Sequence, residues 1–214
     1  MNQLYSRQKI LDRIARVKEN LIDPAELNYI QEDIYKPVVP DALTCFKQEL
    51  EAISGQCVLC GNEEDMCAKL ATLMQTKGLP VLFSRDATIV DKLRRYHVPV
   101  ETDESKFNDM PAGVTACEYL VTRTGSAVVT SSGGSGRQMH VFPPVHIILA
   151  SVDQLVDYLE DALVAVRQKY ENDLPSVITV VTGPSRTADI EKTLVLGAHG
   201  PKELIIFVQQ YRNS

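Results

Sequence analysis

The sequence predicts an α/β fold in which a mostly parallel sheet is flanked by helices and preceded by an N-terminal helical extension. Short apolar runs alternate with amphipathic segments through the middle of the chain, the order expected of βαβ units. Residue types that favour the first or last position of a helix, such as Asn62 and Gly78, lie at the borders of the amphipathic segments. The chain has 214 residues and is 44% hydrophobic, enough to bury a core without disulfides or metals. We expect a helical extension and arm over residues 1–50 and one α/β domain over 51–214.

The first part of the chain predicts a helix and an arm. Residues 4–22 place apolar side chains at helical spacing with polar side chains between them, which is typical of an amphipathic helix. Pro24 ends this helix, and residues 23–44 contain three prolines and little periodicity. A further helical segment is expected around Cys45–Ile53.

Between residues 56 and 100 the pattern alternates strand, helix, strand, helix and strand. Asn62 is suited to cap the first of these helices and Gly78 to end it. The predicted elements are strands at Gln56–Cys60, Val81–Phe83 and Val98–Val100, with helices from Asn62 to Gly78 and over Asp86–Tyr96. This spacing indicates parallel strands joined by helices that cover the sheet.

The second half of the chain adds further strands and a long helix. Cys117–Val121 predicts one helical turn, and Ser151 with Gln154 forms a capping box for a helix over Val152–Tyr170. The predicted strands here are Gly113–Thr115, Ser126–Thr130, His146–Ala150, Val177–Val181 and Leu204–Val208. We expect roughly seven strands in all.

Charge and composition exclude some classes of protein. The formal net charge is −6 and the Lys and Arg residues are scattered, which argues against nucleic-acid binding as the main task. No apolar run approaches the length that spans a membrane, and the charged N-terminus has no apolar signal core. We therefore expect a cytoplasmic protein whose five cysteines are free thiols.

Residues 182–201, TGPSRTADIEKTLVLGAHGP, concentrate polar and special-backbone residues between two apolar strands. Gly183 and Pro184 favour a sharp exit from the first strand, and Thr187 is suited to cap a short turn whose backbone amides bind an anion. Ligands of open α/β sheets lie at the carboxyl ends of strands, so we expect an anion-binding or partner-binding surface here. The candidates are Gly183, Ser185, Arg186, Thr187, Asp189, Glu191, His199 and Gly200. The alternative is a turn held by local caps and ion pairs.

A second glycine-rich stretch lies within residues 122–144. Gly133, Gly134 and Gly136 permit a loop to wrap around a phosphate or carboxylate, with Arg137 supplying the positive charge. The spacing matches neither the phosphate loop nor the dinucleotide fingerprint. A flexible hairpin loop is the alternative.

Glu118 interrupts the apolar run ACEYLV, so its carboxylate either faces solvent or is held for chemistry. Cys57 and Cys60 form a CxxC pair inside a predicted buried strand, where small apolar side chains are suited. A structural zinc or an iron–sulfur cluster needs about four ligands. The sequence has no second CxxC and no paired histidines, so we expect no metal in this chain. It also lacks the GxSxG motif of a hydrolase.

These stretches resemble the lactate utilization protein C family, also called the LUD domain. The C-terminal motif is similar to the family signature almost letter for letter, and the likeness covers the second half of the chain best. The matching elements are GPSRTADIE at 183–191, LGAHGP at 196–201, GVTACE at 113–118, the TGS element with Gly125 and Ser126, Arg137, and FPPVHI at 142–147.

The resemblance implies a cytoplasmic protein that acts in the oxidation of L-lactate to pyruvate. It implies no cofactor in this chain, because iron–sulfur clusters are expected on partner proteins. It also implies a fold similar to the NagB/RpiA/CoA-transferase group. Two departures, Arg123 in place of a carboxylate and Ser126 in place of threonine, bear on the ligand or partner.

Three functions stay open at this point. The first is a subunit without clusters that docks iron–sulfur oxidoreductases, with a small anion bound by Arg137 and Arg186. The second is an independent enzyme on an isomerase-like or acyl-transfer scaffold, with Glu118 as general base or nucleophile. The third is a regulatory module that binds a carboxylate, a sugar phosphate or an acyl-CoA. We expect Glu118, Arg137, Arg186 and His199 to meet around one pocket.

Overall fold

The computed structural model describes residues 7–13, 37–132, 134–171, 173–190 and 193–211, and only the backbone over 187–190 and 193–196. Contacts divide the chain into two units, Met1–Pro37 and Val38–Ser214. Residues 7–13 are helical and fall within the amphipathic helix expected over 4–22, whose other residues lie outside the described ranges. The boundary expected at 50/51 falls inside helix α2 (Ala42–Ala52), which belongs to the second unit.

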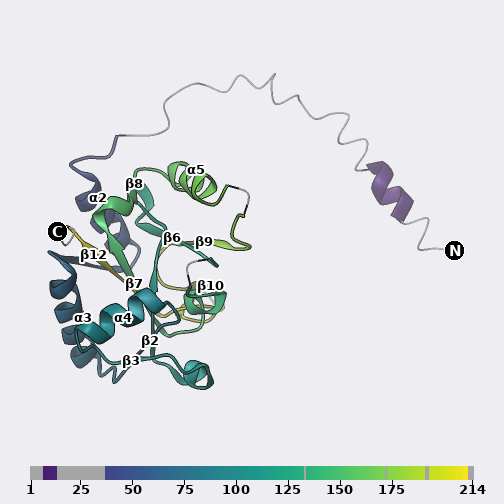
Figure 1. Cartoon of the computed structure of the whole chain (residues 1–214). Helices are drawn as coiled ribbons and strands as arrows, with labels where there is room; N and C mark the ends of the chain where they lie inside the picture. Colours follow the sequence, from purple (N-terminus) through teal and green to yellow (C-terminus); the bar gives the residue numbers. More distant parts are fainter. Residues whose placement is uncertain (1–6, 14–36, 133, 172, 191–192, 212–214) are drawn as a thin grey trace. The chain divides into compact units, whose positions relative to one another are not determined.

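A six-stranded sheet forms the centre of the second unit (Figure 1). All its neighbouring strands are parallel. The predicted α/β fold with a mostly parallel sheet is therefore confirmed. The strand order is β1 (Gln56–Cys60), β12 (Glu203–Gln209), β7 (Val145–Ser151), β4 (Ala112–Ala116), β2 (Leu82–Phe83) and β3 (Val100–Glu101).

Local sequence determines where the connecting helices begin and end. α3 (Glu63–Lys77) begins after Asn62, whose side chain accepts an amide hydrogen bond from the first turn, and it ends at Gly78 in the left-handed conformation. α4 (Ala87–Arg95) begins after Asp86, whose carboxylate accepts two such bonds. Both helices confirm the segments predicted from these caps.

Helices cover both faces of the parallel sheet. Leu70 of α3 packs in the cluster that contains Ile147 of β7, whereas Leu50 of α2 packs with Ile148. Successive residues of β7 therefore enter different cores, as the two-residue period of a strand requires. The α2 face is also covered by a second sheet.

The second sheet has four strands and its own helix. Its inner face joins the α2 core through Leu120, Ala127 and Val129. Its outer face is covered by helix α5, whose Ala162 and Val166 are fully buried. The elements are β8 (Leu155–Val156), β5 (Tyr119–Val121), β6 (Ser126–Thr130), β9 (Ile178–Val181) and α5 (Leu159–Tyr170).

Two predictions in this region are wrong. Tyr119–Val121 forms strand β5 instead of a helical turn, because it pairs with both β6 and β8. The helix predicted to start at Val152 starts at Leu159, because Leu155–Val156 pairs with β5. The Ser151 capping box is present, but it caps only a short 3-10 helix. With these two strands and the two strands of a hairpin over residues 186–196, the described residues form twelve strands instead of roughly seven.

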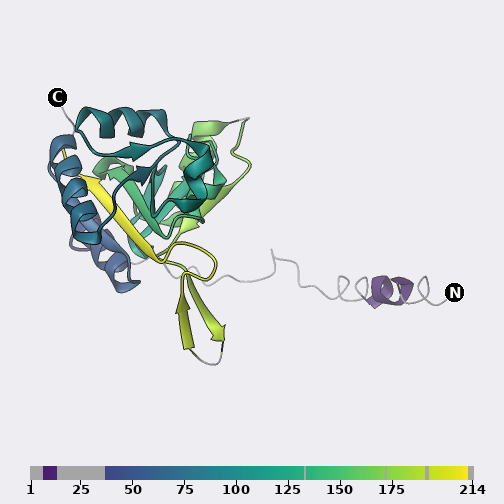
Figure 2. The ribbon, with the colours of Figure 1, turned by 90° about the horizontal axis from the view of Figure 1, so that it is seen from below.

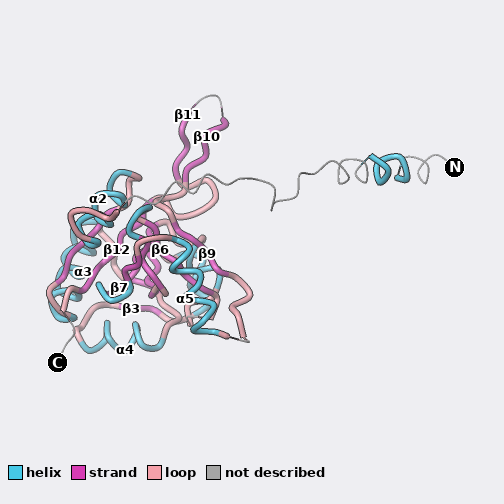
Figure 3. The backbone as a smooth tube through the Cα atoms, turned by 90° about the horizontal axis from the view of Figure 1, so that it is seen from above, coloured by secondary structure: helices cyan, strands magenta, loops and turns pink. Residues whose placement is uncertain are grey.

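The last two short strands form a hairpin that is separate from both sheets. β10 (Arg186–Ile190) pairs antiparallel with β11 (Thr193–Leu196) and with no other described strand. Figures 2 and 3 show this hairpin standing out from the two sheets. The capped turn predicted at Thr187 is therefore wrong, since Thr187 pairs with Val195 in the ladder.

Candidate functional site

The predicted site residues fall into two groups, one at each end of strand β6. Ser126 begins this strand and belongs to the first group, while Thr130 ends it and contacts Glu118 of the second. Four residue steps along a strand span roughly 13 Å. The structure therefore does not bring Glu118 and Ser126 into one pocket.

The first group holds helix α2 against the second sheet. Gly125 has a φ of +57°, and a Cβ at this position would lie 2.2 Å from the amide nitrogen of Leu50. Gly183 has a φ of +75°, and its Cβ would lie 2.7 Å from the carbonyl oxygen of Ile53. Arg186 donates a hydrogen bond to this same carbonyl. Only glycine permits so close a backbone approach in the left-handed region, so these residues fix the end of α2.

Hydroxyl groups surround this contact. Ser126 Oγ lies 2.8 Å from Thr182 Oγ1 and donates to Thr124 Oγ1 at 2.8 Å. The departure from threonine at position 126 therefore keeps the hydrogen bonds of a hydroxyl. Arg123 is half-buried, and its backbone amide donates to Asp157 O at 3.1 Å.

The segment 182–201 does follow the end of a strand, β9, but it lies at the amino ends of the parallel strands. Its last residues lead into β12, where Glu203 pairs with Val145, the first residue of β7. The position expected at the carboxyl ends of the parallel sheet is therefore wrong. Of the other candidates here, the side chains of Thr187 and Asp189 are not described, and Glu191 lies outside the described residues.

Backbone hydrogen bonds close the base of the hairpin. Ser185 donates its amide to Pro201 O at 2.8 Å and accepts from Gly197 N at 2.9 Å. Gly200 lies close to Ser185, since a Cβ at Gly200 would be 3.2 Å from the serine Cβ. His199 is exposed in the loop that follows β11.

The second group lies at the carboxyl end of β4, where Glu118 is held by three side chains. Its carboxylate accepts hydrogen bonds from Tyr170 at 2.6 Å, Lys169 at 2.7 Å and Thr130 at 2.9 Å. Burial opposes ionisation, but the bonds from Lys169, Tyr170 and Thr130 outweigh it and lower the pKa of Glu118. Glu118 is therefore an ionised carboxylate that joins the end of α5 to the second sheet.

Arg137 lies near the same end of β6. It is exposed and donates to Ser176 Oγ at 2.6 Å, and that oxygen lies 3.1 Å from Ser131 Oγ. Ser131 follows Thr130 directly, so Arg137 and Glu118 are placed by neighbouring residues of one strand end. Arg137 also begins the 3-10 helix η3 (Arg137–His140).

The glycine-rich loop before η3 lies beside the carboxyl end of β2. Gly134 and Gly136 both have a φ of +70°, and Cβ atoms there would lie within 3.6 Å of Asp86 and Arg85 respectively. Arg85 donates hydrogen bonds to Glu104 at 2.6 Å and to Gln138 at 3.0 Å, which ties η3 to the 3-10 helix η1 (Glu104–Asp109) that follows β3. Gly133 lies outside the described residues.

A buried polar cluster under η3 was missed by sequence reasoning. Thr115 Oγ1 and His146 Nε2 lie 2.9 Å apart, and both residues are fully buried. The ring of His140 lies 5.9 Å from that of His146 between centroids. Burial, with the charge of His140, lowers the pKa of His146 to about 3, so this imidazole is neutral. The two histidines match no ligand motif, and only the turn of η3 brings them together.

The CxxC pair lies in β1 with its two thiols on opposite faces of the sheet. Cys60 packs with the α3 core and Cys57 with the α2 core. Burial raises the pKa of Cys57 to about 12 and of Cys60 to about 11. Among the described residues, no three His, Cys, Asp or Glu side chains gather as metal ligands.

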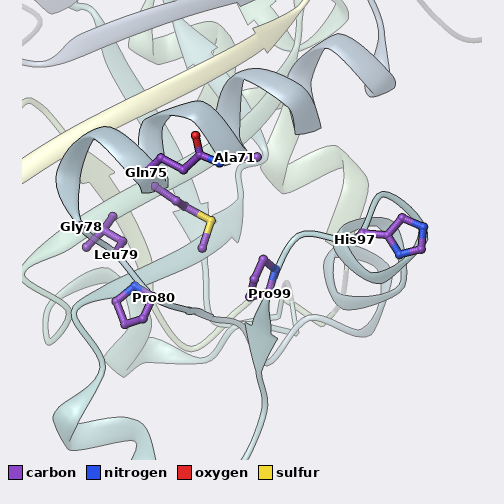
Figure 4. A pocket seen from close by; sticks show the side chains of 8 residues that line it. Ala71, Gln75, Gly78, Leu79, Pro80, His97 and Pro99 are labelled. Atoms are coloured by element: carbon purple, nitrogen blue, oxygen red, sulfur yellow. The ribbon is translucent and has the colours of Figure 1, made fainter.

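A pocket of about 480 Å³ lies elsewhere, at the end of α3 (Figure 4). It is lined mainly by apolar groups and by Gln75 and His97, and it contains none of the predicted site residues. The lining residues are Ala71, Met74, Gln75, Gly78, Leu79, Pro80, His97 and Pro99. In the part of the chain that the structure describes, no helix has the length and apolar character to cross a membrane.

Together these features define an α/β protein with a central parallel sheet, a second small sheet and a projecting hairpin. The sequence profile of the LUD domain matches residues 43–208, and the chain belongs to the LUD domain family. A solved DUF162 family protein from Deinococcus radiodurans superposes with a TM-score of 0.59 over 78% of this chain and 95% of that one, at 17% identity. This likeness supports the fold.

Curated relatives share part of the sequence. An uncharacterized protein of Neisseria meningitidis is 35% identical over 100 residues, 47% of this chain and 42% of the relative. Lactate utilization protein C of Bacillus licheniformis is 35% identical over 102 residues, with the same two shares. The chain therefore spans less than half the length of these relatives. Ribose 5-phosphate isomerase A of Methanocaldococcus jannaschii superposes with a TM-score of only 0.31, at 12% identity.

Proposed function

We propose that this chain is a subunit without clusters of an L-lactate-oxidising assembly, which docks iron–sulfur partner proteins and binds a small anion. The observation that carries the proposal is membership of the LUD domain family, together with relatives that are named lactate utilization protein C. Lactate oxidation to pyruvate needs an electron acceptor. In this proposal the partners supply it through their clusters.

The projecting hairpin is the surface we assign to docking. A two-stranded hairpin is at best marginally stable alone in water. The β10–β11 ladder pairs with no other described strand, yet its sequence carries Ile190, Leu194, Val195 and Leu196. A partner strand that paired with this ladder would supply the further pairing that a two-stranded hairpin needs.

The small anion is assigned to the other end of β6. Arg137 is exposed there and lies beside the hydroxyls of Ser131 and Ser176. A guanidinium with neighbouring hydroxyl donors suits a carboxylate or phosphate. Docking and anion binding are thus assigned to separate surfaces.

The independent enzyme is the less favoured alternative. A general base works best with a pKa near the operating pH, whereas three donors hold the pKa of Glu118 below its ordinary value. Glu118 also lies at the end of β6 opposite to Ser126, whereas Arg186 bonds the carbonyl of Ile53 near the Ser126 end. Arg186 therefore does not line one pocket with Glu118 and Arg137.

Affinity capture tests the docking proposal. The tagged full-length chain, expressed in its source organism during growth on L-lactate, should capture proteins whose iron content and visible absorption identify iron–sulfur clusters. Replacing residues 187–195 with a short Gly/Ser linker should reduce this capture at least tenfold, whereas the surface control Lys47→Gln should not. Capture of no iron–sulfur protein by the wild-type chain would refute the proposal.

A further inference from the structure

Strand β9 (Ile178–Val181) forms one edge of the four-stranded sheet, beside β6 (Figure 1). It pairs antiparallel with β6 in a regular register and with no other described strand. Its sequence, ITVV, holds four β-branched residues and neither a charge nor a proline. Natural proteins usually protect an open strand edge with a charged side chain, a proline or a bulge. Since β9 carries none of these, its open edge is suited to receive a further strand.

Hydrogen bonds with β6 determine which backbone groups of β9 face the open edge. Ser131 donates its amide to Val177 O at 3.0 Å, so these two residues form a hydrogen-bonded pair. Bonded and non-bonded pairs alternate along an antiparallel ladder. Thr179 therefore bonds to β6, whereas the N–H and C=O groups of Ile178 and Val180 point away from β6. These groups are presented to a partner strand.

The same two residues carry exposed apolar side chains on one face of the sheet. Ile178 and Val180 are each 37% exposed. Val180 pairs with Val128, which packs in the core beneath α5, so both side chains lie on the α5 side of the sheet. Thr179 and Val181 point to the other side, where Val181 packs against the α2 core. The open edge thus combines backbone hydrogen-bonding groups with apolar side chains.

A second copy of β9 matches this edge in an antiparallel register. A two-fold axis perpendicular to the sheet at Thr179 keeps the α5 sides of both copies on one face. Ile178 then lies opposite Val180 of the partner subunit, and their backbone groups exchange hydrogen bonds on both sides of the axis. Thr179 lies opposite its own copy, and cross-strand threonine pairs are favourable. Because β9 is uncharged, this pairing places no like charges opposite each other, although the chain has a net charge of −6.

We propose that two copies of this chain associate through β9, which joins their four-stranded sheets into one continuous sheet. The partner is a second copy because the edge is self-complementary: aliphatic Ile178 meets aliphatic Val180, and the hydroxyl residue Thr179 meets itself. Specific interfaces at the small end of the range bury less than about 1,200 Å² and bind weakly, so a single strand pair should dissociate at micromolar concentrations. The association leaves the hairpin β10–β11 free and does not rest on the proposed function.

Sedimentation velocity of the full-length chain, from low to several hundred micromolar, tests this association. The mean mass should rise from 23.8 kDa toward that of a dimer. Val180→Pro removes an N–H at the open edge without breaking the β6 ladder, so this variant should fold and stay monomeric. Ile178→Lys should weaken association by about tenfold or more, because pairing would desolvate the new charge. Val141→Lys, at a position that is 46% exposed outside β9, is the matched control and should associate like the wild type. A wild-type chain that stays monomeric throughout, or Ile178→Lys that associates like the wild type, would overturn the proposal.

A cysteine at the two-fold axis tests the register. Cα atoms of a non-hydrogen-bonded antiparallel pair lie about 4.5 Å apart, within the range that a disulfide spans. Air-oxidised Thr179→Cys should therefore form disulfide-linked dimers on a non-reducing gel, whereas Thr72→Cys, at an exposed position of α3, should not. The five native cysteines are buried, so they should add no crosslinks of their own.

The two variants also separate the proposed partner from other partners of this edge. A wild-type chain that forms dimers while Thr179→Cys gives no crosslink would show that the copies meet elsewhere, and would overturn the assignment to β9. A monomeric wild-type chain whose capture of iron–sulfur proteins is lost in Ile178→Lys would assign the edge to those proteins and overturn self-association.

Discussion

Gly125 lies directly against the backbone of Leu50, so that a Cβ added to the glycine would be 2.2 Å from the leucine amide nitrogen. This contact joins the loop before β6 to helix α2. Gly125→Ala should therefore destabilise the protein by about 3 kcal/mol or more, since it combines left-handed strain with a backbone clash. Urea unfolding followed by circular dichroism measures this free energy.

Gly78 provides the matched control for that substitution. Its φ is +65°, close to that of Gly125, but a Cβ there meets no atom within 4 Å. Gly78→Ala should cost only the left-handed strain, about 1 kcal/mol. Equal losses in the two variants would show that the approach to Leu50 is not tight.

Glu118 should act as a structural ion that joins α5 to the second sheet. Glu118→Gln keeps the shape but weakens the bonds from Lys169, Tyr170 and Thr130, so we expect a loss of about 1–3 kcal/mol at pH 7. The folded pKa of Glu118 is lowered, so its contribution is present above the unfolded pKa and lost as pH falls through the folded value.

The difference in unfolding free energy between wild type and Glu118→Gln should therefore shrink as the solution is acidified. Glu64→Gln, an exposed carboxylate on α3, serves as the control and should change stability by less than about 0.5 kcal/mol. A constant difference between pH 7 and pH 3 would show that Glu118 is not held as an ion.

His146 should make the fold sensitive to mild acid. Its folded pKa is about 3, below the ordinary value near 6.5, so the unfolded chain binds a proton that the folded chain does not. Stability is then full above about pH 6.5 and falls on acidification toward pH 3, by up to about 1.4 kcal/mol per pH unit. Burial lowers the pKa of the adjacent His140 in the same direction.

His146→Leu should flatten this part of the pH profile, while His140 continues to contribute its own share. Thermal unfolding between pH 4 and pH 8 measures the slopes. The same acid slope in wild type and variant would mean that His146 is already solvated in the native state.

The five cysteines should be unreactive in the native protein. All are free and buried, and Cys57 and Cys60 face different cores. Burial holds the pKa values of these two thiols at about 12 and 11, so the reactive thiolate is scarce at pH 8. Ellman's reagent should react only after denaturant is added. Rapid reaction of any native thiol would contradict the burial of the cysteines.

Local signals explain which parts of the fold were predictable. Asn62, Asp86 and Gly78 act through neighbouring residues, so the bounds of α3 and α4 could be read from sequence. Leu155–Val156 has helical spacing, yet it forms a strand because Leu120–Val121 pairs with it from a distant part of the chain. The residues next to Leu155 in the sequence give no sign of this pairing with Leu120–Val121.

In the candidate site, too, the sequence indicates which residues are unusual but not which distant residues they contact. Sequence reasoning identified Gly125, Gly183 and Arg186 as unusual, but their contacts with α2 lie more than seventy residues away along the chain. It placed residues 182–201 near the carboxyl ends of the parallel strands, whereas the register of β12 with β7 places them at the amino ends. His140 and His146 approach only through the packing of η3.

We have proposed that this LUD domain protein acts in lactate oxidation. A strain of the source organism that lacks this gene, grown with lactate present, gives the most direct measurement: L-lactate-dependent dye reduction in its lysate. We predict that this rate is lost and that the purified full-length chain restores it when added. A rate equal to that of the parent strain would contradict the account.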